Sequence, residues 1–521
     1  MRNQPSPPDG APTPTGTGPT LPPREKEAGL TTRRTVLKAI VTAGAAQVFL
    51  GKLGGLRAFA QTASVPMRRT LHGMALDDPD LDAYRTFVDI FLNKTSQSKP
   101  ASWLGFSLQH GTYGGGYKYC PHGDWYFQPW HREYVVMYEQ AVRSVTGHAK
   151  FAMPYWDWTV DRTFPKAFSD ATYKGKPNAL YVAGRTLTTS NWPLKDSIVG
   201  QTQVIDKVYA ETDFQAFGTS KNPAQNNLDM SWVVRGGGIQ GILERTPHNN
   251  IHNFIGHYMP SAGSPRDPIF MMHHGNIDRI WAYWNGLGRS NLSGMSPTDQ
   301  NLWLNMNFKN NYLKPDGTPY SAVVKDLQNF QALGYTYDNL PKTADKKVFD
   351  VERAKRLHAL FATAGQKVEG MQLLRAPNSA AGTAAKPLRK ELKLPKLGAT
   401  MVAPVPEGQR GTEVYAIIRD MKVSADVQAV RVFVNLPNAT ASTPDSDPHF
   451  VDQIGILQHS EHDENHKAPP SALIDLTATL HKLAGEIKDD TISVVLLPVL
   501  REGAAAAKAS VVPASIEIAE L

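Results

Sequence analysis

The 521-residue chain contains only one cysteine, Cys120. A single thiol cannot form an intramolecular disulfide, so the disulfide-stapled class of small secreted proteins is excluded. The folded chain must be held instead by its hydrophobic core, by bound metal, or by both. Hydrophobic residues make up 41% of the sequence, well above the share in disordered chains, and the length allows two or more domains with cores of their own.

The sequence also lacks several features that mark common protein classes. It has no internal repeat and no glycine-rich phosphate-binding loop between a strand and a helix. After the N-terminal region, no apolar run approaches the roughly 20 residues that a membrane-spanning helix requires. The net charge of +7 is unevenly spread, because residues 1–60 carry +5 of it (eight Lys and Arg against three acids) and the remainder only +2. Binding to nucleic acid is therefore not expected.

The first 60 residues are predicted to form an export signal. The paired arginines Arg33 and Arg34 precede a moderately apolar run at residues 39–56, and residues 58–60 (Ala-Phe-Ala) resemble a small-residue cleavage site. This order is typical of a twin-arginine signal. A membrane anchor is the alternative, but Lys52 and several glycines make the run a poor spanning helix. We expect a cleaved signal, export to the periplasm or the medium, and no stable membrane insertion afterwards.

Two sets of histidines dominate the central part of the chain. His248 and His252 lie four residues apart, so on a helix both imidazoles face the same side and can reach a single metal ion. One member of the pair His273 and His274 can supply a third imidazole. Upstream, the chain holds another set of three, which are His110, His122 and His131. Two three-histidine sets in one domain predict a pair of metal sites.

The hydrophobic spacing places most of these histidines on helices. Helices are expected within residues 79–92, 101–110, 130–145, 241–257 and 269–284, and His122 falls in a loop. Four helices would then present five of the six ligands to one another, as metal sites in helical bundles require. The predicted fold class is a mainly α catalytic domain, in which a four-helix bundle holds the two metals.

The composition changes towards the C-terminus. Between residues 375 and 405, Ala, Lys, Pro and Thr prevail and aromatics are few, which is typical of a connector. Short β-branched or alternating runs follow and predict a small antiparallel sandwich; they lie at residues 414–418, 430–434, 450–457, 492–497 and 510–518. We therefore expect the export signal over residues 1–60, the catalytic domain over 61–345, a linker over 346–405 and an all-β domain over 406–521.

The donor set indicates which metal the chain binds. Six neutral imidazoles without a carboxylate or thiolate suit a soft-to-borderline ion, and three nitrogens per metal leave open positions for an exogenous ligand. A zinc pair would normally recruit bridging carboxylates, and a non-haem iron site would include one as well. Two adjacent three-histidine sites are best matched by two copper ions, a pair that binds O2 between the metals and moves two electrons at once.

Several motifs resemble those of a known family. The matching pieces are Cys-Pro-His at 120–122, Trp-His-Arg at 130–132, His-Asn-x-x-His at 248–252, the run 267–281 and Tyr-x-Tyr at 335–337. Together they resemble the type-3 copper proteins, which comprise tyrosinases, catechol oxidases and molluscan-type haemocyanins. The resemblance is that of a bacterial member with plant-type features, and it covers residues 65–339.

The resemblance implies roles for individual residues. Cys120 stands where several relatives carry a Cys–His thioether, so a bond to His122 is expected, with a free buried thiol as the alternative. Glu244 resembles the family's water-holding glutamate and Asn249 its asparagine partner, a pair that could accept the proton of a monophenol. Ser261 stands where some plant-type members place a bulky Phe over the copper, which leaves a phenol more room. The implied ligands are His110, His122 and His131 for the first copper and His248, His252 and His274 for the second, with His273 packing beside them.

The resemblance also implies the function. We expect a tyrosinase that hydroxylates monophenols and oxidises o-diphenols, with phenolic small molecules and O2 as partners and possible homo-oligomers. Catechol oxidase, o-aminophenol oxidase and a haemocyanin-like O2 carrier remain alternatives. The segment after Lys393 resembles the domain that covers the site in latent plant-type proteins, so we expect it to act as a lid. The histidine-rich cluster at 459–466 is expected to be a solvated loop, with a copper-loading site as the alternative.

Overall fold

A computed structural model describes residues 65–187, 194–340, 349–362, 372–378, 380–394, 397–402, 411–458, 468–505 and 509–521. These described residues belong to one compact unit. The predicted export signal and the cluster at 459–466 lie outside the described residues. Within the described ranges, the longest apolar helices fall short of what a membrane crossing needs.

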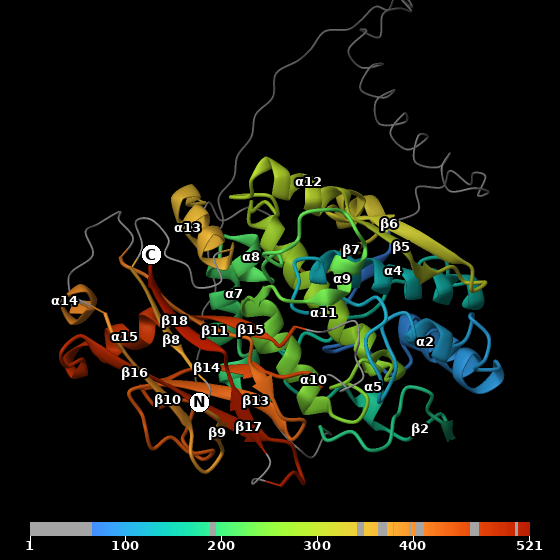
Figure 1. The fold of residues 1–521 in the computed structure, drawn as a ribbon. Helices are drawn as coiled ribbons and strands as arrows, with labels where there is room; N and C mark the ends of the chain where they lie inside the picture. Colours follow the sequence, from blue (N-terminus) through green and yellow to red (C-terminus); the bar gives the residue numbers. More distant parts are fainter. Residues whose placement is uncertain are drawn as a thin grey trace, which may run out of the picture. The chain divides into compact units, whose positions relative to one another are not determined.

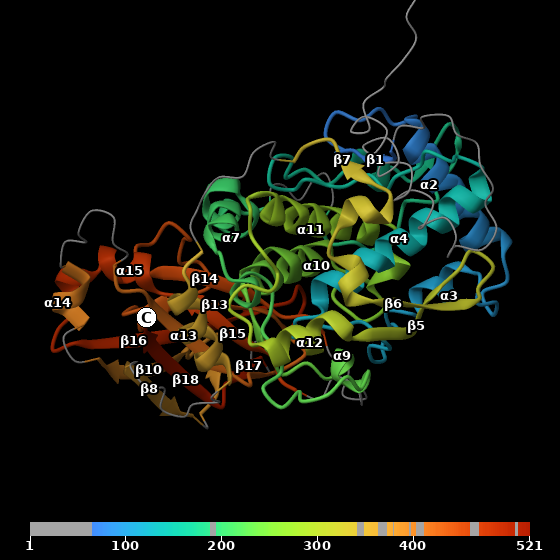
Figure 2. The same cartoon turned by 90° about the horizontal axis from the view of Figure 1, so that it is seen from above.

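The first part of the described chain is helical, as predicted. Its two long helices, α4 (Phe127–Thr146) and α11 (Ile269–Gly286), pack against each other at its centre, with α10 (Asn249–Ile255) nearby (Figure 2). Helix α4 begins three residues earlier than expected and ends at Thr146, and it is followed by Gly147, whose positive φ of 71° suits a glycine C-cap. The segment expected as one helix over 241–257 is a π-helical turn, η3 (Glu244–His248), that continues into α10.

Shorter elements complete the helical part (Figure 1). Helix α2 (Pro79–Asp89) begins where expected, because Asp78 accepts a hydrogen bond from the backbone N–H of Asp80 and Pro79 fits the first turn. The other elements are β1 (Met67–Arg68), η1 (Ile90–Lys94), α3 (Trp103–Ser107), α5 (Lys166–Ser169), β2 (Thr172–Tyr173), β3 (Lys176–Pro177), α6 (Asp196–Val199), η2 (Gln201–Ile205), α7 (Asp206–Ala210), α8 (Phe214–Phe217), α9 (Ser231–Arg235), β4 (Ile239–Gln240), η4 (Ser264–Arg266), α12 (Pro297–Asn305), β5 (Asn307–Leu313), β6 (Pro319–Val323), η5 (Val324–Leu327), η6 (Phe330–Leu333) and β7 (Thr336–Tyr337).

The C-terminal part is rich in β structure, also as predicted. Its main sheets have the strand orders β10-β16-β13-β14 and β4-β15-β11-β18-β8, and β12-β17-β9 form a third, smaller sheet. Apolar side chains of the two main sheets form one buried core, among them Val432, Ile454 and Ile518. The elements are α13 (Val351–Ala362), β8 (Gln372–Pro377), β9 (Gly382–Thr383), β10 (Leu388–Lys393), α14 (Leu397–Val402), β11 (Val414–Arg419), β12 (Lys422–Val423), β13 (Val427–Val434), β14 (Phe450–Gly455), β15 (Ser471–Asp475), α15 (Thr477–Lys482), η7 (Ala484–Glu486), β16 (Thr491–Leu500), β17 (Ser510–Val512) and β18 (Ser515–Glu520).

The region expected as a linker, residues 346–405, contains regular structure. It holds helix α13, and its strands β8 and β10 pair with β18 and β16 in the two main sheets. Low aromatic content made this region resemble a connector, although the strands are held by pairing partners more than a hundred residues away in sequence. Its strands therefore belong structurally to the C-terminal sheets.

The helical and β-rich parts share elements along their boundary. Strand β4 of the helical part pairs in parallel with β15, so that Gln240 lies opposite Ala472. Strand β14, at the edge of its sheet, packs against η3 and α10 (Figure 1). The boundary therefore runs past the segment that carries His248 and His252.

Candidate metal centre

The first histidine set comes from three kinds of local structure. His110 follows α3, His122 lies in a loop, and His131 lies in the second turn of α4. With Cys120, these residues form a buried group in which one potential ligand atom from each lies within 4.8 Å of the others. The structure thus brings together three histidines that are spread over 22 positions of the sequence.

The second set comes from η3, α10 and α11. His248 ends η3, His252 lies in α10, and the pair His273 and His274 lies in α11. These four buried histidines form a second group with potential ligand atoms within 4.8 Å of one another. The two sets face each other, because the rings of His131 and His274 stack with centroids 4.3 Å apart. Two metal sites would therefore be neighbours.

Hydrogen bonds orient the imidazoles towards this centre. A carbonyl oxygen can only accept, so a ring Nδ1 that bonds to one must carry its proton and leave the Nε2 lone pair available for a metal. The Nδ1 donors are those of His110 to the carbonyl of Ala262 (2.6 Å), His131 to Phe127 (2.8 Å) and His252 to Met259 (2.6 Å), and His248 Nδ1 bonds to Asn249 Oδ1 (2.8 Å).

The electrostatics of the centre suit metal-binding imidazoles. Burial lowers the pKa of His110 to about 3 and that of His252 to about 4, so both rings are neutral at physiological pH. The Nε2 atoms of His110 and His248 are buried and have no hydrogen-bond partner among the described residues. An unsatisfied buried polar atom costs about 1–3 kcal/mol, a cost that a metal ion would remove. Neutral nitrogen donors of this kind fit copper.

The structure separates the two adjacent histidines of α11. Trp158 Nε1 donates to His273 Nδ1 (3.2 Å), so the lone pair of that nitrogen is already used. His274 Nε2 instead lies 3.2 Å from Nε2 of His252, where two ring nitrogens converge on one point. This geometry favours His274 over His273 as a ligand, and the assignment stays a prediction.

Cys120 lies inside the first set. Its side chain is fully buried, and burial raises the pKa of its thiol well above the usual value. The position is consistent with a thioether to a histidine. The contact seen is between Cys120 Sγ and Nε2 of His131, at 3.2 Å. The expected partner, His122, belongs to the same group of ligand atoms, and a bond to it stays a prediction.

Glu244 lies beside the first set. Its Oε1 accepts from the backbone N–H of Gly123 (2.8 Å) and lies 3.4 Å from His122 Nδ1, and its Oε2 accepts from the hydroxyl of Thr219. Burial raises the pKa of Glu244 to about 7, although the bonds from Thr219 and Gly123 act in the opposite direction. A carboxylate here can hold the His122 ring in one orientation.

The other two candidate residues are engaged in different ways. Asn249 Oδ1 accepts from His248, while its Nδ2 donates to the carbonyl of Gly455 in β14 (3.0 Å). Ser261 is a small, largely buried residue whose hydroxyl donates to the carbonyl of Tyr258 within its own turn. Asn249 therefore connects a copper-site histidine to the C-terminal part.

Some functional contacts could not be found from the sequence. The carbonyls of Ala262 and Met259 orient one histidine of each set, but a backbone acceptor leaves no trace in residue type. Trp158 is a buried core residue that also bonds to His273. The one sequence feature that could have pointed to this contact is the place of Trp158 in the aromatic run at residues 155–158.

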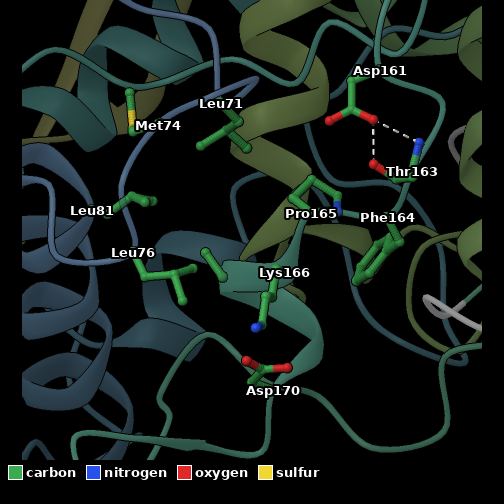
Figure 3. A pocket seen from close by; sticks show the side chains of 11 residues that line it. Leu71, Met74, Leu76, Leu81, Asp161, Thr163, Phe164, Pro165, Lys166 and Asp170 are labelled. Carbon is green, nitrogen blue, oxygen red and sulfur yellow. Dashed lines mark hydrogen bonds between the residues drawn. The ribbon is translucent and has the colours of Figure 1, made fainter.

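The structure also contains a hollow of about 460 Å³ (Figure 3). Apolar side chains, among them Leu71, Leu76 and Phe164, line it together with Lys166 and two aspartates. Asp161 there accepts hydrogen bonds from Thr163. None of its lining residues belongs to either histidine set, so the hollow is not part of the metal centre.

Comparison with known proteins identifies the two parts of the chain. The model of the "common central domain of tyrosinase" matches residues 83–232 and 169–287, and that of the "chloroplastic polyphenol oxidase C-terminal domain" matches residues 402–517. The chain belongs to the tyrosinase and polyphenol oxidase family. Its two histidine-rich sites are those of a type-3 dicopper centre.

Individual family members support this assignment. A tyrosinase of Hahella sp. (strain CCB-MM4) is 29% identical over 241 residues, which cover 43% of this chain and 48% of that protein. A chloroplastic polyphenol oxidase of Malus domestica is 27% identical over 416 residues, which cover 72% of this chain and 64% of that protein. The chain thus spans about half to two-thirds of the length of these curated relatives.

Solved structures of the tyrosinase and polyphenol oxidase family show the same fold. A latent aurone synthase (polyphenol oxidase) superposes with a TM-score of 0.60 at 19% identity, covering 89% of this chain and 92% of that one. A latent apple tyrosinase gives 0.56 at 19% identity, covering 89% and 99%. The helical part followed by a β-rich part is therefore the architecture of latent polyphenol oxidases.

Proposed function

We propose that the protein is an O2-dependent phenol oxidase of the tyrosinase type, which hydroxylates monophenols and oxidises o-diphenols to o-quinones. The observation that carries this proposal is the pair of facing, buried sets of neutral imidazoles, with His131 and His274 stacked at 4.3 Å. When bound there, two copper ions supply O2 binding and two-electron transfer. Overall, one monophenol and one O2 would give one o-quinone and one water, and two o-diphenols and one O2 would give two quinones and two waters.

The histidines would hold the two ions through ring nitrogens. His110, His122 and His131 would take one, and His248, His252 and His274 the other. The bonds that fix Nδ1 of His110, His131, His248 and His252 support this assignment, because they present Nε2 to the centre before any metal arrives. Pre-oriented ligands lose less conformational entropy when the metal binds.

Hydroxylation of a monophenol requires a group that takes up the phenol proton. We assign this role to Glu244 through a water that it shares with Asn249. The support is positional, because Glu244 lies 3.4 Å from His122 and Asn249 bonds to His248, one histidine of each set. The small side chain of Ser261, turned into its own hydrogen-bonded turn, is consistent with room for a phenol ring.

The C-terminal β-rich part is proposed to act as a lid. Support comes from the contact of β14 with η3 and α10, the elements that carry His248 and His252. In this proposal the catalytic domain covers residues 61–345 and the lid begins within 346–405. Residues 1–60 are proposed to direct export, and fractionation of cells that express the Arg33→Lys/Arg34→Lys double variant tests that role: loss of export is expected, whereas unchanged export would contradict it.

Oxygen uptake by the copper-loaded full chain tests the activity. We expect uptake with both tyrosine and L-DOPA, and a marked increase after limited proteolysis that detaches the lid. Uptake with L-DOPA alone would identify a catechol oxidase and remove the proposed roles of Glu244, Asn249 and Ser261. Reversible O2 binding without turnover of either phenol would identify an oxygen carrier.

A further inference from the structure

An asparagine-lined seam joins the lid to the second histidine set. Strand β14 lies at the edge of its sheet, so the carbonyls on its outer side have no strand partner among the residues that the structure describes. Asn249 and Asn250 of α10 donate to two of them instead, and Asn253 donates to the carbonyl of Ile456, which follows β14. The bonds run from Asn249 Nδ2 to the carbonyl of Gly455 (3.0 Å), from Asn250 Nδ2 to that of Gln453 (3.2 Å) and from Asn253 Nδ2 to that of Ile456 (3.0 Å).

At Gly455, the backbone of β14 lies very close to the backbone of α10. A Cβ atom built on this glycine would lie 2.7 Å from Asn249 Cβ and 2.7 Å from the backbone nitrogen of Asn250. Both distances are too short for a carbon contact, so any larger residue would push β14 away from α10. Gly455 is therefore the point on which docking of the lid depends.

Asn249 links the carbonyl of Gly455 to a copper-site histidine through hydrogen bonds. Its amide is held at both ends, because Oδ1 accepts from His248 Nδ1 (2.8 Å) while Nδ2 donates to Gly455 and, at 3.3 Å, to Gln240 Oε1. A flipped amide would lose these bonds together. The carbonyl of Gly455 thus helps to keep Oδ1 on His248, which keeps the Nε2 lone pair of that ring turned towards the centre.

A second hydrogen bond from the C-terminal part holds the loop that orients one histidine of each set. Just beyond β14, the backbone N–H of Gln458 donates to the carbonyl of Pro260 (2.7 Å). Pro260 follows Met259, whose carbonyl orients His252, and lies two residues before Ala262, whose carbonyl orients His110. The lid therefore fixes the short loop that positions one histidine of each set.

We propose that the C-terminal part is a positioning element for both copper sites, in addition to being a cover. This inference rests on the proposed function of the histidines as copper ligands. A pure cover would change access to the centre and leave its equilibrium affinity for copper unchanged. A positioning element would lower that affinity when it is displaced, because His248, His252 and His110 would lose part of their support.

The test displaces the lid in the full-length chain with Gly455→Ala and compares it with Gly485→Ala. Gly485 lies in the same part of the chain, and a Cβ there would have no atom within 4 Å, so this variant controls for the substitution itself. Copper content is measured after equilibrium competition with a chelator. Accessibility cancels at equilibrium, because a more open site speeds both binding and release.

We expect Gly455→Ala to weaken copper binding roughly five- to tenfold, the effect of about one lost hydrogen bond, and Gly485→Ala to match the wild type. The double variant Asn250→Ala/Asn253→Ala removes lid contacts without touching a ligand histidine, and the same loss is expected. It also keeps the test open if Gly455→Ala does not fold.

Unchanged copper affinity in a variant whose lid is more sensitive to protease would overturn the inference and leave the cover intact. Absence of phenol turnover in the wild type would instead refute the proposed function, while the copper competition would still report on positioning. The two failures are therefore distinguishable.

Discussion

At the residue scale, the adjacent histidines of α11 give the sharpest contrast. His274 Nε2 converges with His252 Nε2, whereas Nδ1 of His273 already accepts from Trp158. We expect His274→Ala to retain one copper per chain instead of two and to lose more than about 100-fold of its activity. His273→Asn, the matched control, should retain both coppers. The copper content of the purified variants measures the effect. If His273→Asn lost one copper and His274→Ala kept both, His273 would be the ligand and His274 would not.

Glu244 tests whether the site removes a proton from monophenols. Glu244→Gln keeps the size of the side chain and an acceptor for Gly123, so the local fold should persist. We expect the rate with tyrosine to fall by about 100-fold and the rate with L-DOPA to change far less, because only the monophenol must lose its proton to a base. Steady-state oxygen uptake with both substrates measures the effect.

The control for Glu244→Gln is Glu133→Gln, which neutralises another buried carboxyl, one that accepts from the hydroxyl of Tyr320. This variant should not alter the ratio of the two rates. An equal loss of both rates in Glu244→Gln would mean that Glu244 acts by holding His122, which lies 3.4 Å away.

At the element scale, a buried charge network ties α4 and α11 to β1 and β7. Asp278 accepts from Arg132 Nε (2.6 Å), Arg68 Nη1 (2.9 Å) and the hydroxyls of Tyr335 and Tyr337. Asp278→Asn would remove the carboxylate partner of the buried Arg132, whereas Arg68 would keep its ion pair with Glu139. We expect a loss of about 3–5 kcal/mol in the free energy of unfolding.

Denaturant unfolding monitored by tryptophan fluorescence measures this loss. Glu352→Gln is the control, because it breaks an exposed ion pair with Lys355 at 2.8 Å, and such pairs contribute about 1 kcal/mol or less. If Asp278→Asn were as mild as the control, the network would not stabilise the helix pair.

How far the elements follow from the sequence depends on the range of the interactions that form them. Helices such as α11 were predicted because apolar residues repeat at helical spacing within the element, and its bounds differ from the expected ones by only two residues at the C-terminal end. Strands β8 and β10 were missed, because their stability comes from pairing with β18 and β16 and not from local composition. The histidine sets were predictable from spacing and motif, whereas the carbonyls of Met259 and Ala262 that orient them depend on tertiary structure.

At the scale of the whole molecule, helix α13 connects the helical and β-rich parts through charged groups. Arg353 bonds to Glu211 of the helical part and to Glu413 ahead of β11. One turn further along, His358 Nε2 contacts Asp213 Oδ2 at 2.7 Å. The contacts between the helical and β-rich parts therefore include a titratable pair.

This contact predicts a dependence of stability on pH. Burial acts to lower the pKa of His358, but the charge of Asp213, its hydrogen bond and the bond to the carbonyl of Gly294 together outweigh burial and raise the pKa above its usual value of 6.5. A folded-state pKa above the unfolded value means that the protonated form is stabilised on folding. The contribution is thus complete below about pH 6.5 and is lost as the pH rises through the folded-state pKa.

We therefore expect the denaturant midpoint of the wild type to fall as the pH is raised through that range, and His358→Gln to lose this part of the slope. His148→Gln serves as the control, since its ring meets Asp80 at 2.9 Å at the surface of the helical part, away from the lid. Limited proteolysis at each pH adds a local readout, because release of α13 should make the helix itself more accessible to protease. A slope that persists unchanged in His358→Gln would mean that other groups cause it and that the contact between His358 and Asp213 does not.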